Sequence, residues 1–146
     1  MNNQKNIVLC GVGGQGTVLA SKLLAAAAMS KDIPVMSAET IGMAQRGGSV
    51  FSHLRMGDNL YSPMIETGTA DLIIGFEPGE TVRMLPYLKD HGHIVVSTRA
   101  VKPVTATLSG SDYDAPQMLE YLKAAVPNLT LVNADQACAD MVLPKY

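Results

Sequence analysis

The chain has 146 residues, of which 47% are hydrophobic and 16% charged, and its net charge at pH 7 is −2. This composition supplies a buried core for one compact domain and excludes a disordered or solvating tail. No stretch concentrates lysine and arginine, and the longest apolar stretch, residues 23–29, is far shorter than a membrane span. We therefore expect neither nucleic acid nor a membrane as a partner, and a single domain over residues 1–146.

The two cysteines, Cys10 and Cys138, lie far apart and neither belongs to a CxxC pair. This argues against a zinc ribbon and against a redox dithiol. An iron–sulfur cluster normally needs more thiolates than this chain contains. The apolar run that follows the polar N-terminus is too short for a secretory signal, so we expect a cytoplasmic, reducing location.

The first elements along the chain predict a β-α-β unit. Residues 7–10 form a short apolar run that is typical of a buried parallel strand. From residue 15 to residue 29 apolar side chains recur at a spacing of three to four, which predicts a helix. Residues 33–38 predict a second strand. Residues 40–48 show neither periodicity and contain three glycines, so we expect an ordered loop.

Residues 50–56 alternate in polarity, which is strand spacing. A turn cluster follows at residues 57–59 and leads to Leu60 and Tyr61, which predicts a hairpin and hence an antiparallel element. In the second half of the chain we expect strands at 70–76, 93–97, 104–108 and 129–132, a turn at 90–92, and helices at 78–88, 114–126 and 135–141. Asp114 is the expected N-cap of the helix at 114–126.

Strands that alternate with helices predict an α/β fold with three layers, α/β/α. Within that class we expect a Rossmann-like, mixed but mostly parallel sheet that carries the hairpin as an insertion.

A glycine-rich motif, G-x-G-x-x-G, occupies residues 11–16 between the first strand and the first helix. Glycines let the backbone turn tightly, and free N–H groups at a helix start favour an anion such as pyrophosphate. The candidate binding residues are Gly11, Gly13, Gly14, Gln15 and Gly16. Glu39, after the second strand, stands where a nicotinamide-binding unit would hold a ribose. The alternative is a turn that only lets helix and sheet pack closely.

A second candidate loop contains Gln45, Arg46, Gly47 and Gly48. An arginine beside two glycines can direct a guanidinium and backbone N–H groups toward a phosphate or a carboxylate. A surface loop, or an arginine that contacts a partner subunit, is the alternative. If both loops follow neighbouring strands, they face each other across the crevice where open α/β sheets bind ligands.

Other chemistries find no support in the residue pattern. His53, His91 and His93 show no metal-ligand spacing, and no G-x-S-x-G sequence is present. Cys10 is expected to be a small buried hydrophobe. We therefore predict no catalytic residue and no metal ligand in this chain, and interpret it as a binding or accessory subunit.

The motif at 11–16, together with the segments at 42–50 and 52–55, resembles the gamma-type domain of 2-oxoacid:ferredoxin oxidoreductases. The specific resemblance is to the small (beta) subunits of indolepyruvate ferredoxin oxidoreductases. It extends over nearly the whole chain through the segments at 61–63, 76–78, 85–88 and 98–99. The family's small subunits continue beyond the length of this chain, mostly as helix.

The resemblance implies an accessory subunit of an enzyme that oxidatively decarboxylates an aryl 2-oxoacid to an acyl-CoA and passes electrons to ferredoxin. It places thiamine diphosphate and the 4Fe–4S clusters in the large (alpha) subunit. It also puts Gly13, Gly14, Gln15 and the loop from Gln45 to Gly48 near coenzyme A. Two other readings stay open: a free-standing NAD(P)-binding oxidoreductase domain, and an interaction module without a ligand.

Overall fold

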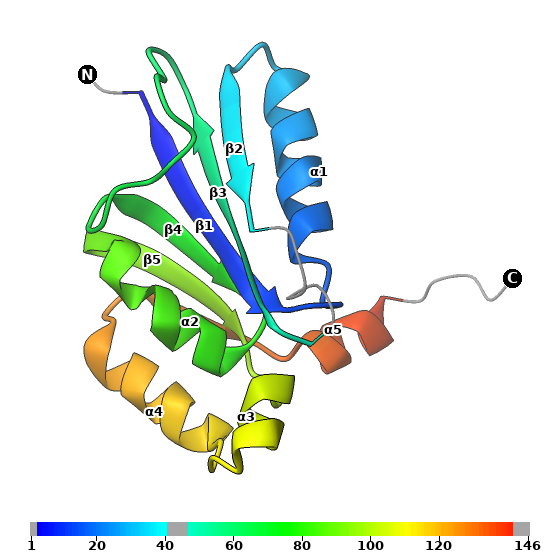
Figure 1. The fold of residues 1–146 in the computed structure, drawn as a ribbon. Coiled ribbons are helices and arrows are strands. Elements are labelled where there is room, and N and C mark those ends of the chain that lie inside the picture. Colours follow the sequence, from blue (N-terminus) through cyan, green and yellow to red (C-terminus); the bar gives the residue numbers. More distant parts are fainter. Residues whose placement is uncertain (1–2, 41–46, 142–146) are drawn as a thin grey trace, which may run out of the picture.

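The computed structural model describes residues 3–40 and 47–141, and within them six strands form one sheet in the order β2-β3-β1-β4-β5-β6 (Figure 1). The strands are β1 (Lys5–Val12), β2 (Val35–Glu39), β3 (Ser49–Met56), β4 (Ala70–Gly75), β5 (Leu88–Ser97) and β6 (Leu129–Val132). Neighbours among β1, β4, β5 and β6 pair in parallel, whereas β3 is antiparallel to both β1 and β2. The mixed, mostly parallel sheet is confirmed.

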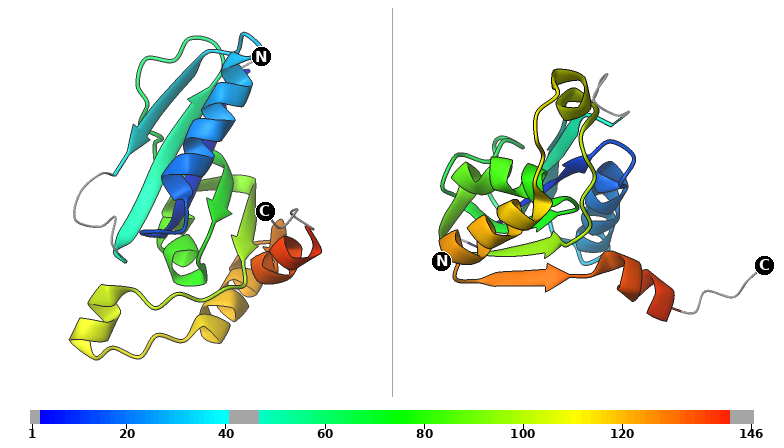
Figure 2. Two further views of the ribbon diagram at one scale, coloured as in Figure 1. Left: turned by 90° about the vertical axis from the view of Figure 1, so that its right-hand side faces the viewer. Right: turned by 90° about the horizontal axis from the view of Figure 1, so that it is seen from below.

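Helices cover both faces of this sheet. They are α1 (Thr17–Met29), α2 (Pro78–Met84), α3 (Val104–Ser109), α4 (Ala115–Ala125) and α5 (Ala134–Asp140), and a 3₁₀ turn, η2 (Leu85–Tyr87), follows α2. Helix α1 packs against β1, β2 and β3, while α2 packs against β1, β4 and β5 and also against α4. Seen along the sheet, α1 lies on one side and α2 with α4 on the other, which confirms the α/β/α layers (Figure 2).

The core divides into two clusters, one on each face of the sheet. On the α2 and α4 side, Val8, Cys10, Ile73, Ile94 and Leu122 are buried together. On the α1 side the cluster is smaller and consists of Ile7, Leu9 and Leu54, with Leu24 and small residues of α1 packed against it. The expected burial of Cys10 is therefore confirmed.

Side-chain caps mark the starts of α2, α4 and α5. The Asp114 carboxylate accepts a hydrogen bond from the Gln117 backbone N–H at 3.1 Å, as an N-cap should. Helix α2 ends at Met84, earlier than the predicted residue 88. Pro86 accounts for this difference, because proline lacks an N–H donor and disfavours helix at the residue before it. No helix among residues 3–40 and 47–141 is long and apolar enough to cross a bilayer.

The predicted hairpin at residues 57–61 is wrong. Both edges of β3 are already occupied, by β1 and by β2, so Leu60 and Tyr61 have no strand to pair with. The Gln4 side-chain amide donates to the Asp58 carbonyl at 2.8 Å and holds this segment as bends. The hairpin in the structure joins β2 to β3, and most of the loop predicted at 40–48 lies outside the described residues.

The strand predicted at 104–108 is also wrong, because this segment forms helix α3. Its β-branched residues favour a strand locally, but the Thr107 backbone N–H donates to the Pro103 carbonyl at 3.1 Å in a helical turn. Gly110 ends the helix in the left-handed conformation, with φ at 66°. The turn predicted at 90–92 lies inside β5, where the pairing with β4 is irregular and His91 has a φ of 61°.

Candidate functional site

The first glycine loop connects the carboxyl end of β1 to the start of α1. Gly14 and Gly16 have φ values of 98° and 86°, and a Cβ at either position would meet open space. Backbone conformation, rather than crowding, therefore requires glycine at these two positions. Gly16 is the N-cap of α1, and no side chain accepts from the first turn there. Those N–H groups suit an anionic ligand.

Gly11 has a different reason to be glycine. A Cβ at this position would lie 2.8 Å from Gln15 Oε1, 2.9 Å from Thr17 Oγ1 and 3.0 Å from Phe76 Cβ. The residue is buried in β1. Gly11 thus allows the loop and the helix to pack closely over the strand, which is the close-packing function of glycine in this motif.

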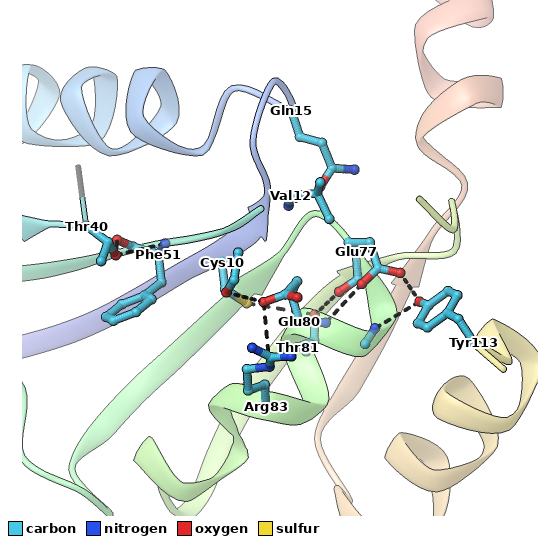
Figure 3. A network of polar contacts seen from close by, with 12 residues as sticks. Cys10, Val12, Gln15, Thr40, Phe51, Glu77, Glu80, Thr81, Arg83 and Tyr113 are labelled. Carbon is cyan, nitrogen blue, oxygen red and sulfur yellow. Dashed lines mark hydrogen bonds and ion pairs between the residues drawn. The ribbon is translucent and has the colours of Figure 1, made fainter. Parts of the chain in front are cut away.

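Gln15 ties the loop to the neighbouring strand. Its Oε1 accepts from the backbone N–H of Val12, which lies beside it in Figure 3, at 2.7 Å. Its Nε2 donates to the Phe76 carbonyl at 3.1 Å. The side-chain amide bridges the carboxyl ends of β1 and β4. It holds the shape of the loop, and one of its two N–H donors carries the bond to Phe76.

The second glycine loop meets the first. The Gly13 backbone N–H donates to the Gly48 carbonyl at 2.8 Å, and the Gly47 carbonyl accepts from the Val104 backbone N–H at 3.1 Å. The two loops meet because β3 is antiparallel to β1, so the start of β3 lies beside the end of β1. The sequence predicted this meeting on the condition that both loops follow neighbouring strands, whereas Gly47 and Gly48 in fact precede β3. Gln45 and Arg46 lie outside the described residues.

Two hollows flank the first glycine loop, and Gly14 lines both. One, of about 310 Å³, lies toward α1 and β3 and includes Gly13, Gly16, Thr17 and Val50 in its lining. The other, of about 290 Å³, lies toward the ends of β4 and β5 and includes Gln15, Phe76 and Arg99. Of the predicted site residues that the structure describes, Gly13, Gly14, Gln15 and Gly16 therefore line these two hollows, whereas Gly11, Gly47 and Gly48 do not.

A polar network beside the loops was not predicted from the sequence (Figure 3). Glu77, fully buried, caps α2 by accepting from the Glu80 N–H at 2.9 Å, and it also accepts from the Tyr113 hydroxyl. Ser49 on β3 donates to the buried Glu80 carboxylate at 2.5 Å. Burial raises the pKa of Glu77. The network joins α2 to β3 and to the segment after α3. The sequence signal was the dipeptide Glu77-Pro78, since proline favours the first helical position after a capping residue.

Two buried side chains near the core, Cys10 and His53, show no sign of catalytic activation. Burial raises the pKa of the Cys10 thiol to about 12, so it stays protonated and is not a nucleophile at neutral pH. The Nδ1 of buried His53 accepts from the Ile65 N–H at 2.8 Å, and burial lowers its pKa. Among the residues that the structure describes, no group of three or more His, Cys, Asp and Glu side chains could hold a metal ion.

Glu39 ends β2, but β3 lies between β2 and β1. In a nicotinamide-binding unit, the acidic residue follows a strand that adjoins the glycine-loop strand. The inserted antiparallel strand therefore moves Glu39 away from the position that a ribose contact requires.

Comparison with known proteins identifies the fold and its relatives. The sequence matches the pyruvate ferredoxin/flavodoxin oxidoreductase family over residues 6–143. It is 39% identical over 90% of its length to the indolepyruvate oxidoreductase subunit IorB of Archaeoglobus fulgidus, and 42% identical over 74% of its length to that of Methanothermobacter thermautotrophicus. It spans 65% and 55% of those two subunits.

A solved structure shares the fold at low sequence identity. The 2-oxoglutarate:ferredoxin oxidoreductase of Magnetococcus marinus, solved with 2-oxoglutarate, coenzyme A and succinyl-CoA, matches with a TM-score of 0.67 at 17% identity. The match covers 97% of this chain and 22% of that one. Because the family model matches residues 6–143, nearly the whole chain, the chain belongs to the pyruvate ferredoxin/flavodoxin oxidoreductase family.

Proposed function

We propose that the chain is the accessory subunit of an indolepyruvate-type ferredoxin oxidoreductase. The enzyme oxidatively decarboxylates an aryl 2-oxoacid to an aryl-acyl-CoA, and ferredoxin accepts the electrons. The observation that carries this proposal is the identity of 39% and 42% to two indolepyruvate oxidoreductase subunits, over 90% and 74% of this chain. The chain on its own is inactive in this proposal, and its location is cytoplasmic.

The redox cofactors belong to the large (alpha) subunit in this proposal. The residues of this chain do not fit an iron–sulfur cluster, because a cluster needs several thiolates. The sequence has two cysteines, of which Cys10 is fully buried with a pKa of about 12. The 4Fe–4S clusters are therefore assigned to the partner, through which electrons reach ferredoxin. Thiamine diphosphate is assigned to the same partner on the family resemblance alone.

Coenzyme A is the proposed ligand of the glycine loops. The uncapped first turn of α1 offers N–H donors to a phosphate group. Thr17, 3% exposed, lines the adjacent hollow, and its Oγ1 has no hydrogen-bond partner among the described residues. Gly13, Gly14, Gln15 and Gly16 supply the backbone turn, and the segment from Gln45 to Gly48 is proposed to face it. The fold relative from Magnetococcus marinus was solved with coenzyme A bound.

Co-expression with the cognate large subunit tests the proposal. Dye reduction with indolepyruvate and coenzyme A is expected only when both chains are present and co-purify as a heteromer. Turnover by the large subunit alone, or by this chain alone, would contradict the proposed accessory role. Titration of the isolated chain separates the other readings. Micromolar binding of NADH without binding of coenzyme A favours a nicotinamide domain, and binding of neither favours a ligand-free interaction module.

A further inference from the structure

The hollow on the β4 and β5 side of the glycine loop lies where the chain changes direction across the sheet. Strand β1 leads to α1 on one face, and its parallel neighbour β4 leads to α2 on the opposite face. Open α/β sheets bind ligands in the crevice outside the carboxyl ends of two such strands. The hollow of about 290 Å³ occupies this position, with Gln15 after β1, Phe76 after β4, Arg99 after β5 and Ala134 after β6.

Arg99 is the one charged residue among those that line this hollow. Its Nη1 lies 3.2 Å from Asp135 Oδ1, and the two side chains are 60% and 68% exposed. An ion pair this exposed contributes little to stability and is easily exchanged for another acceptor. The guanidinium has five N–H donors, so most of its capacity remains after this single contact.

A hydrogen bond holds the main chain at Arg99. Its N–H donates to the Ser97 hydroxyl at 3.2 Å, directly after β5. The Gln15 amide, in the same lining, is held by Val12 and Phe76. The lining thus offers two side chains with N–H donors, of which the Arg99 guanidinium carries the charge. A planar guanidinium in such a place suits the oxygens of a carboxylate or a phosphate.

We propose that Arg99 binds an anionic oxygen group, a carboxylate or a phosphate, in the crevice between the carboxyl ends of β1, β4, β5 and β6. The incoming anion replaces Asp135 as the acceptor for the guanidinium. This subsite lies on the other side of the glycine loop from the hollow at Thr17. The proposal that Arg99 binds an anion depends on the proposed function only where the natural ligand is to be identified.

The test is calorimetric titration of the purified full chain with two probes, sodium pyrophosphate and sodium phenylacetate. Tighter binding of pyrophosphate indicates a phosphate subsite, and tighter binding of phenylacetate indicates a carboxylate subsite. Arg99→Ala is expected to weaken binding of the preferred probe at least about tenfold, as the loss of a charge-assisted contact should. Arg99→Lys is expected to restore binding in part, because lysine keeps the charge without the planar fork. Asp135→Asn should leave binding equal or tighten it, since it removes the competing acceptor.

Arg83→Ala is the matched control. Arg83 is 64% exposed and has a single carboxylate contact, to Glu80 at 4.0 Å, but it does not line this hollow. The proposal fails if wild-type chain binds neither probe up to about 20 mM, or if Arg83→Ala weakens binding as much as Arg99→Ala. It also fails if Asp135→Asn weakens binding as Arg99→Ala does, which would make the pair a structural clip for α5.

Circular dichroism and thermal melting of each variant show whether it is folded, and Arg99→Gln replaces Arg99→Ala if the latter is not. Because these titrations need no large subunit, their failure is distinguishable from failure of the dye-reduction assay.

Discussion

The two faces of the sheet differ in the side chains that pack against them. On the α2 and α4 face, Ile73, Ile94 and Leu122 are fully buried in one continuous cluster. On the α1 face the helix buries mainly small side chains, Thr17, Ser21 and Ala28, while Leu19 and Leu23 are 62% and 63% exposed. The comparison indicates that the first face supplies most of the stability, whereas the second is constrained by the glycine loop that starts α1.

The α1 face also contains buried hydroxyl groups that have no hydrogen-bond partner among the described residues. They belong to Thr17 and Ser21, one helical turn apart, and to Ser52 on β3. Ser52 pairs with Leu9, which places it on the same face as α1. An unpaired buried hydroxyl costs about 1–3 kcal/mol. This face therefore carries a stability cost next to the candidate ligand hollow.

The largest expected effect is on the α2 and α4 face. Leu122→Ala should lower the free energy of unfolding by about 2–5 kcal/mol, because it leaves a cavity in a closed core. Leu23→Ala, on exposed α1 surface, should change it by less than about 0.5 kcal/mol. Urea unfolding of both variants measures the difference. An equal decrease in the free energy of unfolding for both variants would contradict the difference between the two faces.

The next effect separates two kinds of glycine in the loop. Gly11→Ala should cost about 1–3 kcal/mol, since its Cβ would crowd Gln15 and Thr17. Gly16→Ala should cost about 1–2 kcal/mol from its left-handed backbone alone. Gly16→Asn should recover part of that loss, because asparagine tolerates the left-handed conformation. At position 11 no residue with a Cβ should recover stability, because the Cβ itself causes the crowding. Thermal melting of the variants distinguishes crowding from backbone strain, and recovery by Gly11→Asn would contradict the crowding argument.

A smaller effect concerns pH. Burial lowers the pKa of His53 in the folded state, so the unfolded chain binds a proton first as pH falls below about 6.5. The free energy of unfolding should therefore decrease as the pH falls from about 6.5 toward the folded pKa, by at most about 1.4 kcal/mol per pH unit.

His53→Gln isolates this contribution. The glutamine oxygen can still accept from the Ile65 N–H, while the variant should lose the pH slope that His53 supplies. Glu77, whose pKa is raised by burial, gives a slope of opposite sign above its ordinary pKa, but it is present in both proteins and cancels in the comparison. Urea unfolding at several pH values provides the slopes, and identical slopes would contradict the assignment.

The smallest expected effect on stability is at Arg46, which lies outside the described residues and remains a sequence-based candidate. Arg46→Ala should change the free energy of unfolding by less than about 0.5 kcal/mol. It should raise the coenzyme A requirement, or loosen the complex with the large subunit, by more than about tenfold. Arg46→Lys should rescue only in part. A variant that unfolds while its ligand dependence is unchanged would show that Arg46 is structural.

Elements with strong local signals were predictable. The apolar run at 7–10 lies within β1, and Asp114 caps α4. The helix predicted after residue 15 is α1, but Leu19 and Leu23, which contributed to the predicted apolar spacing, are exposed rather than on its buried face. Each of these depends on residues within a few positions of one another. The glycine motif was identified for the same reason, and its positions 14 and 16 have the backbone conformations that favour glycine.

The tertiary structure decided which distant segments of the chain pair with one another. Strand β3 enters between β1 and β2, which rules out the 57–61 hairpin and displaces Glu39. The same insertion brings Gly48 to Gly13, and the fold brings Ser49 to Glu80 and Tyr113 to Glu77. Capping and periodicity are fixed by neighbours along the chain, whereas strand order depends on which edge each strand finds free. That choice is made only when the whole sheet assembles.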